Sequence, residues 1–184
     1  MVATRLFTAE DLEAFTENEE KLYEVVDGVL MRNEGVGGRH GNMSFEIGYN
    51  LHAFTGPRRL GRVFGGDTRF ILRRDPDLVL IPDIAFVRAA RIPAEGVWER
   101  IIPIPPDFAL EIASITDTAA AVRRKAALYL DHGVRLVWIV WPSQRSVSVL
   151  QLGQPEMMLH EGDELDGADV IPGFRLPVAE IFAN

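Results

Sequence analysis

Cysteine is absent from this chain of 184 residues. The absence excludes a disulfide scaffold, a zinc ribbon and a thiol nucleophile, so a metal would need oxygen ligands or the four histidines. Lysine is nearly absent as well, because 17 of the 19 basic residues are arginine and only Lys21 and Lys125 are lysine. Each of these two lysines therefore calls for a specific explanation.

Long apolar runs are also missing. No run approaches the roughly 18 residues of a membrane span, and the start MVATRLFTAED lacks the pattern of a signal peptide. We therefore expect a cytoplasmic protein without membrane contact. The net charge of -8 argues against tight, non-specific DNA binding, which depends on many basic contacts to phosphate, but leaves room for a local basic groove.

The composition, 47% apolar and 25% charged, is typical of a globular protein, and we expect one domain over residues 1–184. The hydrophobic periodicity predicts an α/β fold with a mixed sheet. Because a strand, a helix and a further strand follow one another over residues 108–141, a parallel crossover is expected at its centre. The predicted helices cover residues 9–15, 40–54 and 118–130, and the predicted strands cover 22–26, 29–33, 62–65, 68–72, 79–87, 108–113, 136–141, 146–150 and 157–160.

Two carboxylates stand where core residues would be expected. Glu111 interrupts the apolar segment Phe-Ala-Leu-Glu-Ile-Ala, and strand alternation places it on the same face as Ala109 and Ala113. Asp83 shares its strand face with Ala85 in the same way. A buried carboxylate must be protonated, paired or metal-bound, and oxygen ligands of this kind suit Mg²⁺ or Mn²⁺.

Lys125 is the third candidate residue. Val122, Leu128 and Tyr129 lie three or four positions away, so Lys125 lies on the helix stripe that should face the sheet. An inward-facing lysine near an interior glutamate predicts either an ion pair without chemistry or a group that orients a water beside a metal.

Several segments resemble the Uma-type family of restriction-endonuclease-like proteins. They include YEVVDG from Tyr23, RHG from Arg39, PDIAFV from Pro82, PDFALEIAS from Pro106, RKAALYL from Arg124, VWIV from Val137 and IPGF from Ile171. The order of these segments is that of the family, and the resemblance covers nearly the whole chain. The family belongs to the PD-(D/E)XK nuclease superfamily.

The resemblance implies a restriction-endonuclease-like core, a central mixed β-sheet flanked by helices, and Mg²⁺-dependent (or Mn²⁺-dependent) hydrolysis of nucleic acid, with DNA as the expected substrate. Asp83 and Glu111 match its metal-binding acids, helped by the backbone carbonyl of Ile112. Glu24 also matches a recurrent acid that would add negative charge near the metal. Lys125 fits the place of a catalytic lysine moved to the following helix.

Two positions depart from the pattern. The usual lysine position, two residues after the second acid, is Ala113, and Trp141 stands where an aspartate is common. The displaced lysine keeps a second hypothesis open, in which the chain is a catalytically inactive, dimeric binding or regulatory module on a nuclease fold. We expect a homodimer in either case, joined through apolar segments around Trp98 and Trp141. A glycosidase built on two carboxylates fits the lone lysine poorly.

Other polar residues have open alternatives. His40 could contact a substrate phosphate or serve a structural purpose, and Glu24 could be an ordinary surface residue of a hairpin. Asp77 is interpreted as a turn residue, and Asp107 as a solvated or capping residue. Six arginines close together in the sequence predict either a DNA groove or a solvated basic surface: Arg58, Arg59, Arg62, Arg69, Arg73 and Arg74.

Overall fold

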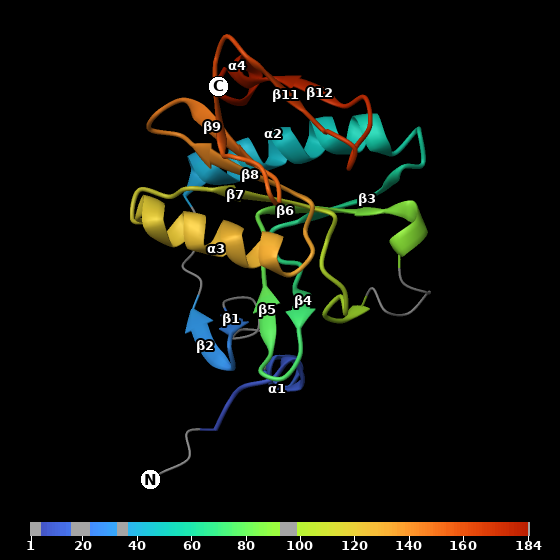
Figure 1. Ribbon diagram of the computed structural model, residues 1–184, viewed down its shortest axis with the longest axis vertical. Helices are drawn as coiled ribbons and strands as arrows, with labels where there is room; N and C mark the ends of the chain where they lie inside the picture. Colours follow the sequence, from blue (N-terminus) through green and yellow to red (C-terminus); the bar gives the residue numbers. More distant parts are fainter. Residues whose placement is uncertain (1–4, 16–22, 33–36, 93–98, 184) are drawn as a thin grey trace.

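A six-stranded sheet with a helix on each face forms the centre of the computed structural model, which describes residues 5–15, 23–32, 37–92 and 99–183 (Figure 1). Its strand order is β10-β9-β8-β7-β6-β3, in which β7 and β8 are parallel and all other neighbours are antiparallel. The strands are β3 (Gly61–Gly65), β6 (Ile84–Arg88), β7 (Phe108–Ile112), β8 (Leu136–Trp141), β9 (Ser146–Leu150) and β10 (Met157–His160). The mixed α/β sheet and its parallel crossover are therefore confirmed.

A separate four-stranded sheet contains the first hairpin. Its order is β2-β1-β5-β4, built from β1 (Tyr23–Val26), β2 (Val29–Arg32), β4 (Phe70–Arg73) and β5 (Leu78–Leu80). The prediction of one strand over residues 79–87 is wrong, because β5 ends before Pro82 and β6 begins after it in the other sheet. Proline has no N–H to donate to a ladder, which favours a break at this position.

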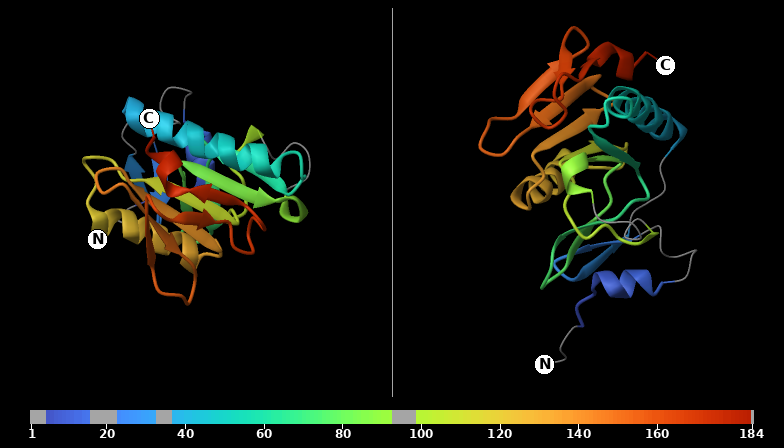
Figure 2. Two further views of the ribbon diagram at one scale, coloured as in Figure 1. Left: turned by 90° about the horizontal axis from the view of Figure 1, so that it is seen from above. Right: turned by 90° about the vertical axis from the view of Figure 1, so that its right-hand side faces the viewer.

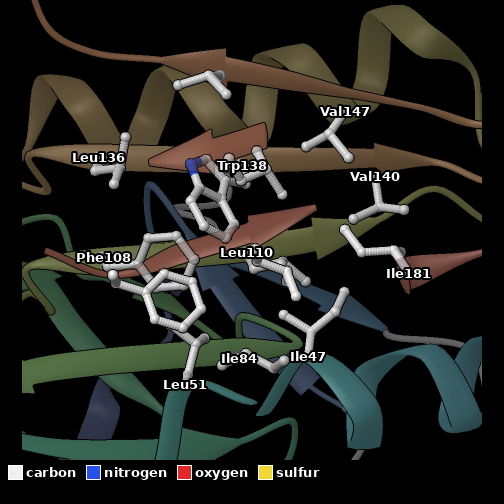
Figure 3. Close-up of a cluster of buried hydrophobic side chains, with 14 of the residues drawn as sticks. Ile47, Leu51, Ile84, Phe108, Leu110, Leu136, Trp138, Val140, Val147 and Ile181 are labelled. Atoms are coloured by element: carbon white, nitrogen blue, oxygen red, sulfur yellow. The ribbon is translucent and has the colours of Figure 1, made fainter. Parts of the chain in front are cut away.

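The helices α2 (Gly38–Thr55) and α3 (Ala119–Asp131) cover opposite faces of the six-stranded sheet (Figure 1). The α2 stripe of Met43, Ile47 and Leu51 packs into a core that includes Phe108 and Trp138 (Figure 3). On the other face, Val122, Ala126 and Tyr129 of α3 pack over smaller residues such as Ala85, Ala109 and Val137. The α3 face is therefore the one with room for polar side chains.

Local signals set several element boundaries. Helix α1 (Ala9–Glu13) begins with a capping box between Thr8 and Asp11. Asp27 and Gly28 both have positive φ, which the two-residue turn between β1 and β2 requires. Thr118 caps α3, because its side chain accepts from the N–H of Ala121.

The C-terminal part forms a small layer that the sequence did not predict. It contains the strands β11 (Glu164–Asp166) and β12 (Arg175–Pro177) and the short helix α4 (Val178–Ile181). Elsewhere in the chain, a short 3-10 helix, η2 (Ala89–Arg91), follows β6. This layer lies at the opposite end of the molecule from α1 (Figure 2). None of the helices within the described ranges combines the length and apolar character needed to cross a bilayer.

Candidate metal centre

Glu111 lies on β7, and Asp83 directly precedes the neighbouring antiparallel strand β6. Ile84, the first residue of β6, is the register partner of Leu110 on β7, and Asp83 directly precedes it and accepts from the N–H of Ile112, the residue after Glu111. Ala85 and Ala109 belong to the apolar cluster beneath α3, whereas Ile84 and Leu110 belong to the cluster beneath α2. The predicted face of Glu111 is therefore confirmed, whereas Asp83 lies before its strand begins.

Lys125 extends from α3 to this part of the sheet. Its Nζ lies 3.0 Å from Glu111 Oε2, 2.9 Å from Glu24 Oε1 and 2.9 Å from the carbonyl oxygen of Ile81. An ammonium group has three hydrogens, and three acceptors surround it here. The inward orientation predicted from the helix stripe is confirmed.

Ile81 marks the point where the chain passes from the small sheet to the large one. Its N–H donates to Glu24 Oε1 at 2.7 Å, and its carbonyl accepts from Lys125. Glu24, on β1, is only 6% exposed, so its interpretation as a surface residue is wrong. The Glu24–Lys125 pair thus satisfies both backbone groups of Ile81 and ties the two sheets together.

Tyr129 is a site residue that the sequence reasoning missed. Its hydroxyl donates to Glu111 Oε1 at 2.7 Å, and the residue is fully buried. The helical spacing predicts Tyr129 only as part of the apolar stripe. Its position one helical turn after Lys125 is the signal that could have placed its hydroxyl beside the same carboxylate.

Asp83 is held from the other face of the sheet. His40 Nε2, in the first turn of α2, lies 2.9 Å from Asp83 Oδ1, and the N–H of Ile112 donates to Asp83 Oδ2 at 2.7 Å. Ser44 Oγ lies 3.4 Å from the Asp83 carbonyl oxygen. The structure therefore brings His40 to the candidate site as a partner of Asp83; contact with a substrate stays a prediction.

The charges of this cluster do not balance. Three carboxylates, Glu24, Asp83 and Glu111, surround the single ammonium group of Lys125. Burial raises the pKa of Glu111 to about 8, with help from Asp83 and Glu24, although Lys125 and the Tyr129 hydroxyl act in the opposite direction. Burial alone would lower the pKa of Lys125, but the carboxylates of Glu111, Glu24 and Asp83 raise it above its ordinary value.

This donor set fits a divalent cation of the Mg²⁺ type. Within residues 5–15, 23–32, 37–92 and 99–183, no group of three or more Asp, Glu or His side chains is arranged to hold a metal ion. Mg²⁺, however, usually takes only one or two carboxylates and completes its shell with water and substrate oxygens. Asp83 and Glu111 provide those two carboxylates, and the excess negative charge is what such a cation would neutralise.

Other predicted polar residues lie away from this cluster. Asp107 is fully buried and paired with Arg88 and Arg91, so its interpretation as a solvated residue is wrong. Asp77 is also buried and accepts hydrogen bonds from the backbone of Ala9 and Asp75, which extends its turn role to the docking of α1.

The arginine cluster in the sequence does not become one row of free cations. Arg58 donates to the carbonyl of Phe54, Arg73 pairs with Asp27, and Arg74 pairs with Glu10 and Asp77. Trp141 is 5% exposed, and its indole N–H donates to Ser148. It therefore offers little surface for the expected dimer, while Trp98 and Lys21 lie outside the described residues.

Comparison with known proteins agrees with this architecture. Residues 9–179 match the family described as "Putative restriction endonuclease", known as Uma2. No curated protein matches the sequence significantly. A crystal structure from Anabaena variabilis, described as "a putative nuclease belonging to DUF820", has a TM-score of 0.83 and 22% identity, covering 96% of this chain and 98% of that one. That similarity shows the fold, and the family match supports a nuclease.

Proposed function

The chain belongs to the Uma2 family, and on that premise we propose that it is a Mg²⁺-dependent or Mn²⁺-dependent endonuclease that hydrolyses phosphodiester bonds of DNA. One observation carries the proposal: Asp83 accepts from the N–H of Ile112, the residue after Glu111, and Lys125 lies 3.0 Å from Glu111. This is the combination of two acids and one cation that metal-assisted phosphodiester hydrolysis uses.

The residues of the candidate centre have separate roles in binding the cation and in orienting its ligands. Asp83 and Glu111, with the backbone carbonyl of Ile112, would hold the cation, and Glu24 would add negative charge behind them. When bound, Mg²⁺ or Mn²⁺ supplies positive charge at the scissile phosphate and acidifies a water molecule. His40 and the Ile112 N–H orient the Asp83 carboxylate, since each lies within hydrogen-bonding distance of one of its oxygens.

Lys125 contributes a fixed positive charge close to the reacting phosphate. Its three acceptors in this structure are Glu24, Glu111 and the Ile81 carbonyl. Direct contact with a phosphate or a water would require Lys125 to exchange one of them. Its side chain is 22% exposed, so the group lies near the protein surface.

A cleavage assay tests this proposal. Supercoiled plasmid is incubated with the protein and Mg²⁺, Mn²⁺ or EDTA, and Asp83→Asn and Glu111→Gln are compared with the wild type. We expect cleavage only with a divalent cation and a loss of about 100-fold or more in each variant, because each removes charge that is needed in the transition state. Glu156→Gln, at an exposed ion pair, is the matched control. Unchanged cleavage in Asp83→Asn and Glu111→Gln would contradict the assignment.

A second candidate, a nuclease fold that binds or regulates without cutting, is favoured by one observation. Tyr129 and Lys125 already satisfy Glu111, and all three hydrogens of Lys125 have protein acceptors. Thermal melts with and without Mn²⁺ separate the candidates, since a cation that binds the folded state raises the melting temperature. A shift that Asp83→Asn abolishes supports the nuclease, whereas the absence of both shift and cleavage supports the non-catalytic module.

A further inference from the structure

The two carboxylate oxygens of Glu111 are occupied unequally by their neighbours. Oε1 accepts from the Tyr129 hydroxyl at 2.7 Å and also lies 3.0 Å from Lys125 Nζ. Within the described part of the chain, Oε2 contacts one donor, the same Nζ, at 3.0 Å. An ionised carboxylate has about two acceptor positions on each oxygen. Oε1 is therefore filled, whereas Oε2 retains one open position.

The two donors on Oε1 differ in how easily they can leave it. Lys125 has a long, flexible side chain that is 22% exposed, so water can take over its contacts. Tyr129 is fully buried, and its ring packs in the apolar cluster between α3 and the sheet. Turning its hydroxyl away from Glu111 would leave a buried donor without a partner, which is costly. Tyr129 is thus the neighbour that keeps Oε1 occupied.

Asp83 is held in a different way. Its Oδ1 lies 2.9 Å from His40 Nε2, and its Oδ2 accepts from the Ile112 N–H at 2.7 Å. Among the contacts of the described residues, each oxygen of Asp83 therefore keeps one open position. Only Glu111, of these two acids, has one oxygen filled and the other open, so a restriction on the cation would come from Glu111.

Divalent cations differ in how they use a carboxylate. Mg²⁺ requires a near-octahedral arrangement of single oxygens, whereas Ca²⁺ takes roughly six to eight oxygens and often binds both oxygens of one carboxylate. Mn²⁺ shares the octahedral preference for oxygen ligands. A glutamate with one open oxygen therefore suits Mg²⁺ and Mn²⁺, and denies Ca²⁺ a second bond.

We propose that Tyr129 is a positioning residue that restricts Glu111 to one metal-binding oxygen, Oε2, and so makes the centre select Mg²⁺ and Mn²⁺ over Ca²⁺. This inference rests on the proposed nuclease function and assigns the origin of its cation selectivity. The spacing of the sequence provides the arrangement, because Lys125 and Tyr129 lie one helical turn apart on α3 and reach the same carboxylate.

The test is isothermal titration calorimetry of the intact chain with Mn²⁺ and, separately, with Ca²⁺. We expect the wild type to bind Mn²⁺ at least about 10-fold more tightly than Ca²⁺, and Tyr129→Phe to reduce this ratio about 10-fold, as partners of metal ligands commonly change affinity. Freed from the hydroxyl, Oε1 can serve as a second ligand for Ca²⁺. Tyr49→Phe makes the same chemical change at a residue 60% exposed on α2, and it should leave both affinities unchanged.

A ratio of affinities separates positioning from a merely structural role. If Tyr129 only stabilises the fold, Tyr129→Phe weakens both cations by the same factor, and that result would overturn the inference. A wild type that binds Ca²⁺ as tightly as Mn²⁺ would do so as well.

Infrared difference spectra of the wild type provide a measurement that does not depend on the stability of a variant. The two carboxylate stretching bands lie closer together when both oxygens bind one cation than when a single oxygen does, and loss of a band in Glu111→Gln identifies its source. We expect widely separated Glu111 bands with Mn²⁺ and with Ca²⁺. Closely spaced Glu111 bands with Ca²⁺ in the wild type would refute the restriction.

Asp83→Asn keeps this inference distinct from the proposed function. If Mn²⁺ binding requires Asp83 but the ratio of affinities is the same in Tyr129→Phe and the wild type, the positioning role fails while the metal centre stands. If the wild type does not bind Mn²⁺, or Asp83→Asn binds it equally well, the metal centre itself fails and the inference fails with it.

Discussion

Replacing Lys125 by methionine removes the one ammonium group of the candidate centre and retains an unbranched side chain of similar length. Glu24 and Glu111 are 8% and 10% exposed in their side chains, and both lie within 3.0 Å of Lys125. Without it, the nearly buried carboxylate of Glu24 loses its cation, Glu111, whose pKa is about 8, loses a hydrogen-bond donor, and so does the Ile81 carbonyl. Breaking a buried pair from one side costs about 3–5 kcal/mol.

The lower end of that range applies, because Lys125 itself is 22% exposed and water can partly replace it. We therefore expect Lys125→Met to lower the free energy of unfolding in EDTA by about 3 kcal/mol. At a urea dependence of about 2 kcal/mol per molar, the unfolding midpoint falls by about 1.5 M. Circular dichroism during urea titration measures this shift.

The control is Arg123→Met on the same helix. Arg123 pairs with Glu156 at the surface, where the two side chains are 41% and 30% exposed, and an exposed pair contributes about 0–1 kcal/mol. A double-mutant cycle with Glu111→Gln should give a coupling energy of at least about 1 kcal/mol for Lys125, since the two groups are in contact. If Lys125→Met unfolds at the same urea concentration as Arg123→Met, the carboxylates do not depend on Lys125 and the reasoning is refuted.

Three further predictions concern the same network and its neighbour. The pKa of Glu111 is raised from 4.5 to about 8, so between these pH values the folded state holds a proton that the unfolded state has lost. The free energy of unfolding in EDTA should therefore fall as pH rises from about 5 to 8. Urea titrations should show no such slope in Glu111→Gln. Tyr129→Phe removes a donor from a buried carboxylate and should cost about 1.5–3 kcal/mol in urea titrations; a cost below about 0.5 kcal/mol would show that the hydroxyl is dispensable. Asp107→Asn leaves Arg88 and Arg91 without their shared carboxylate and should lower the free energy of unfolding by about 3 kcal/mol, measured by urea titration. An unchanged unfolding midpoint would contradict a stabilising pair.

Local periodicity was enough to place two of the site residues on the correct face. Alternation along β7 put Glu111 beside Ala109, and the helical stripe of α3 put Lys125 toward the sheet. Both inferences use only the direction of a side chain relative to its own element. The direction depends on backbone geometry, and neighbouring residues report that geometry directly.

The partners across the fold could not be read in this way. Glu24 meets Lys125 from another sheet, and His40 meets Asp83 from a helix on the opposite face. Such contacts depend on which strands pair, and the break at Pro82 changes that pairing. A continuous apolar stretch from Val79 to Val87 is compatible with one buried strand or with two, because periodicity does not record which sheet a strand joins.

The break at Pro82 also explains why acids gather here. A chain that leaves one sheet and enters another exposes backbone groups that no ladder can satisfy, and buried groups of this kind must find other partners. The carboxylate of Glu24 and the ammonium of Lys125 take that place at Ile81. Asp83, two residues further on, directly precedes β6 and accepts from the N–H of Ile112, next to Glu111. The junction between the sheets thus needs a charged pair for structural reasons, and that pair holds Glu111 where a cation would bind.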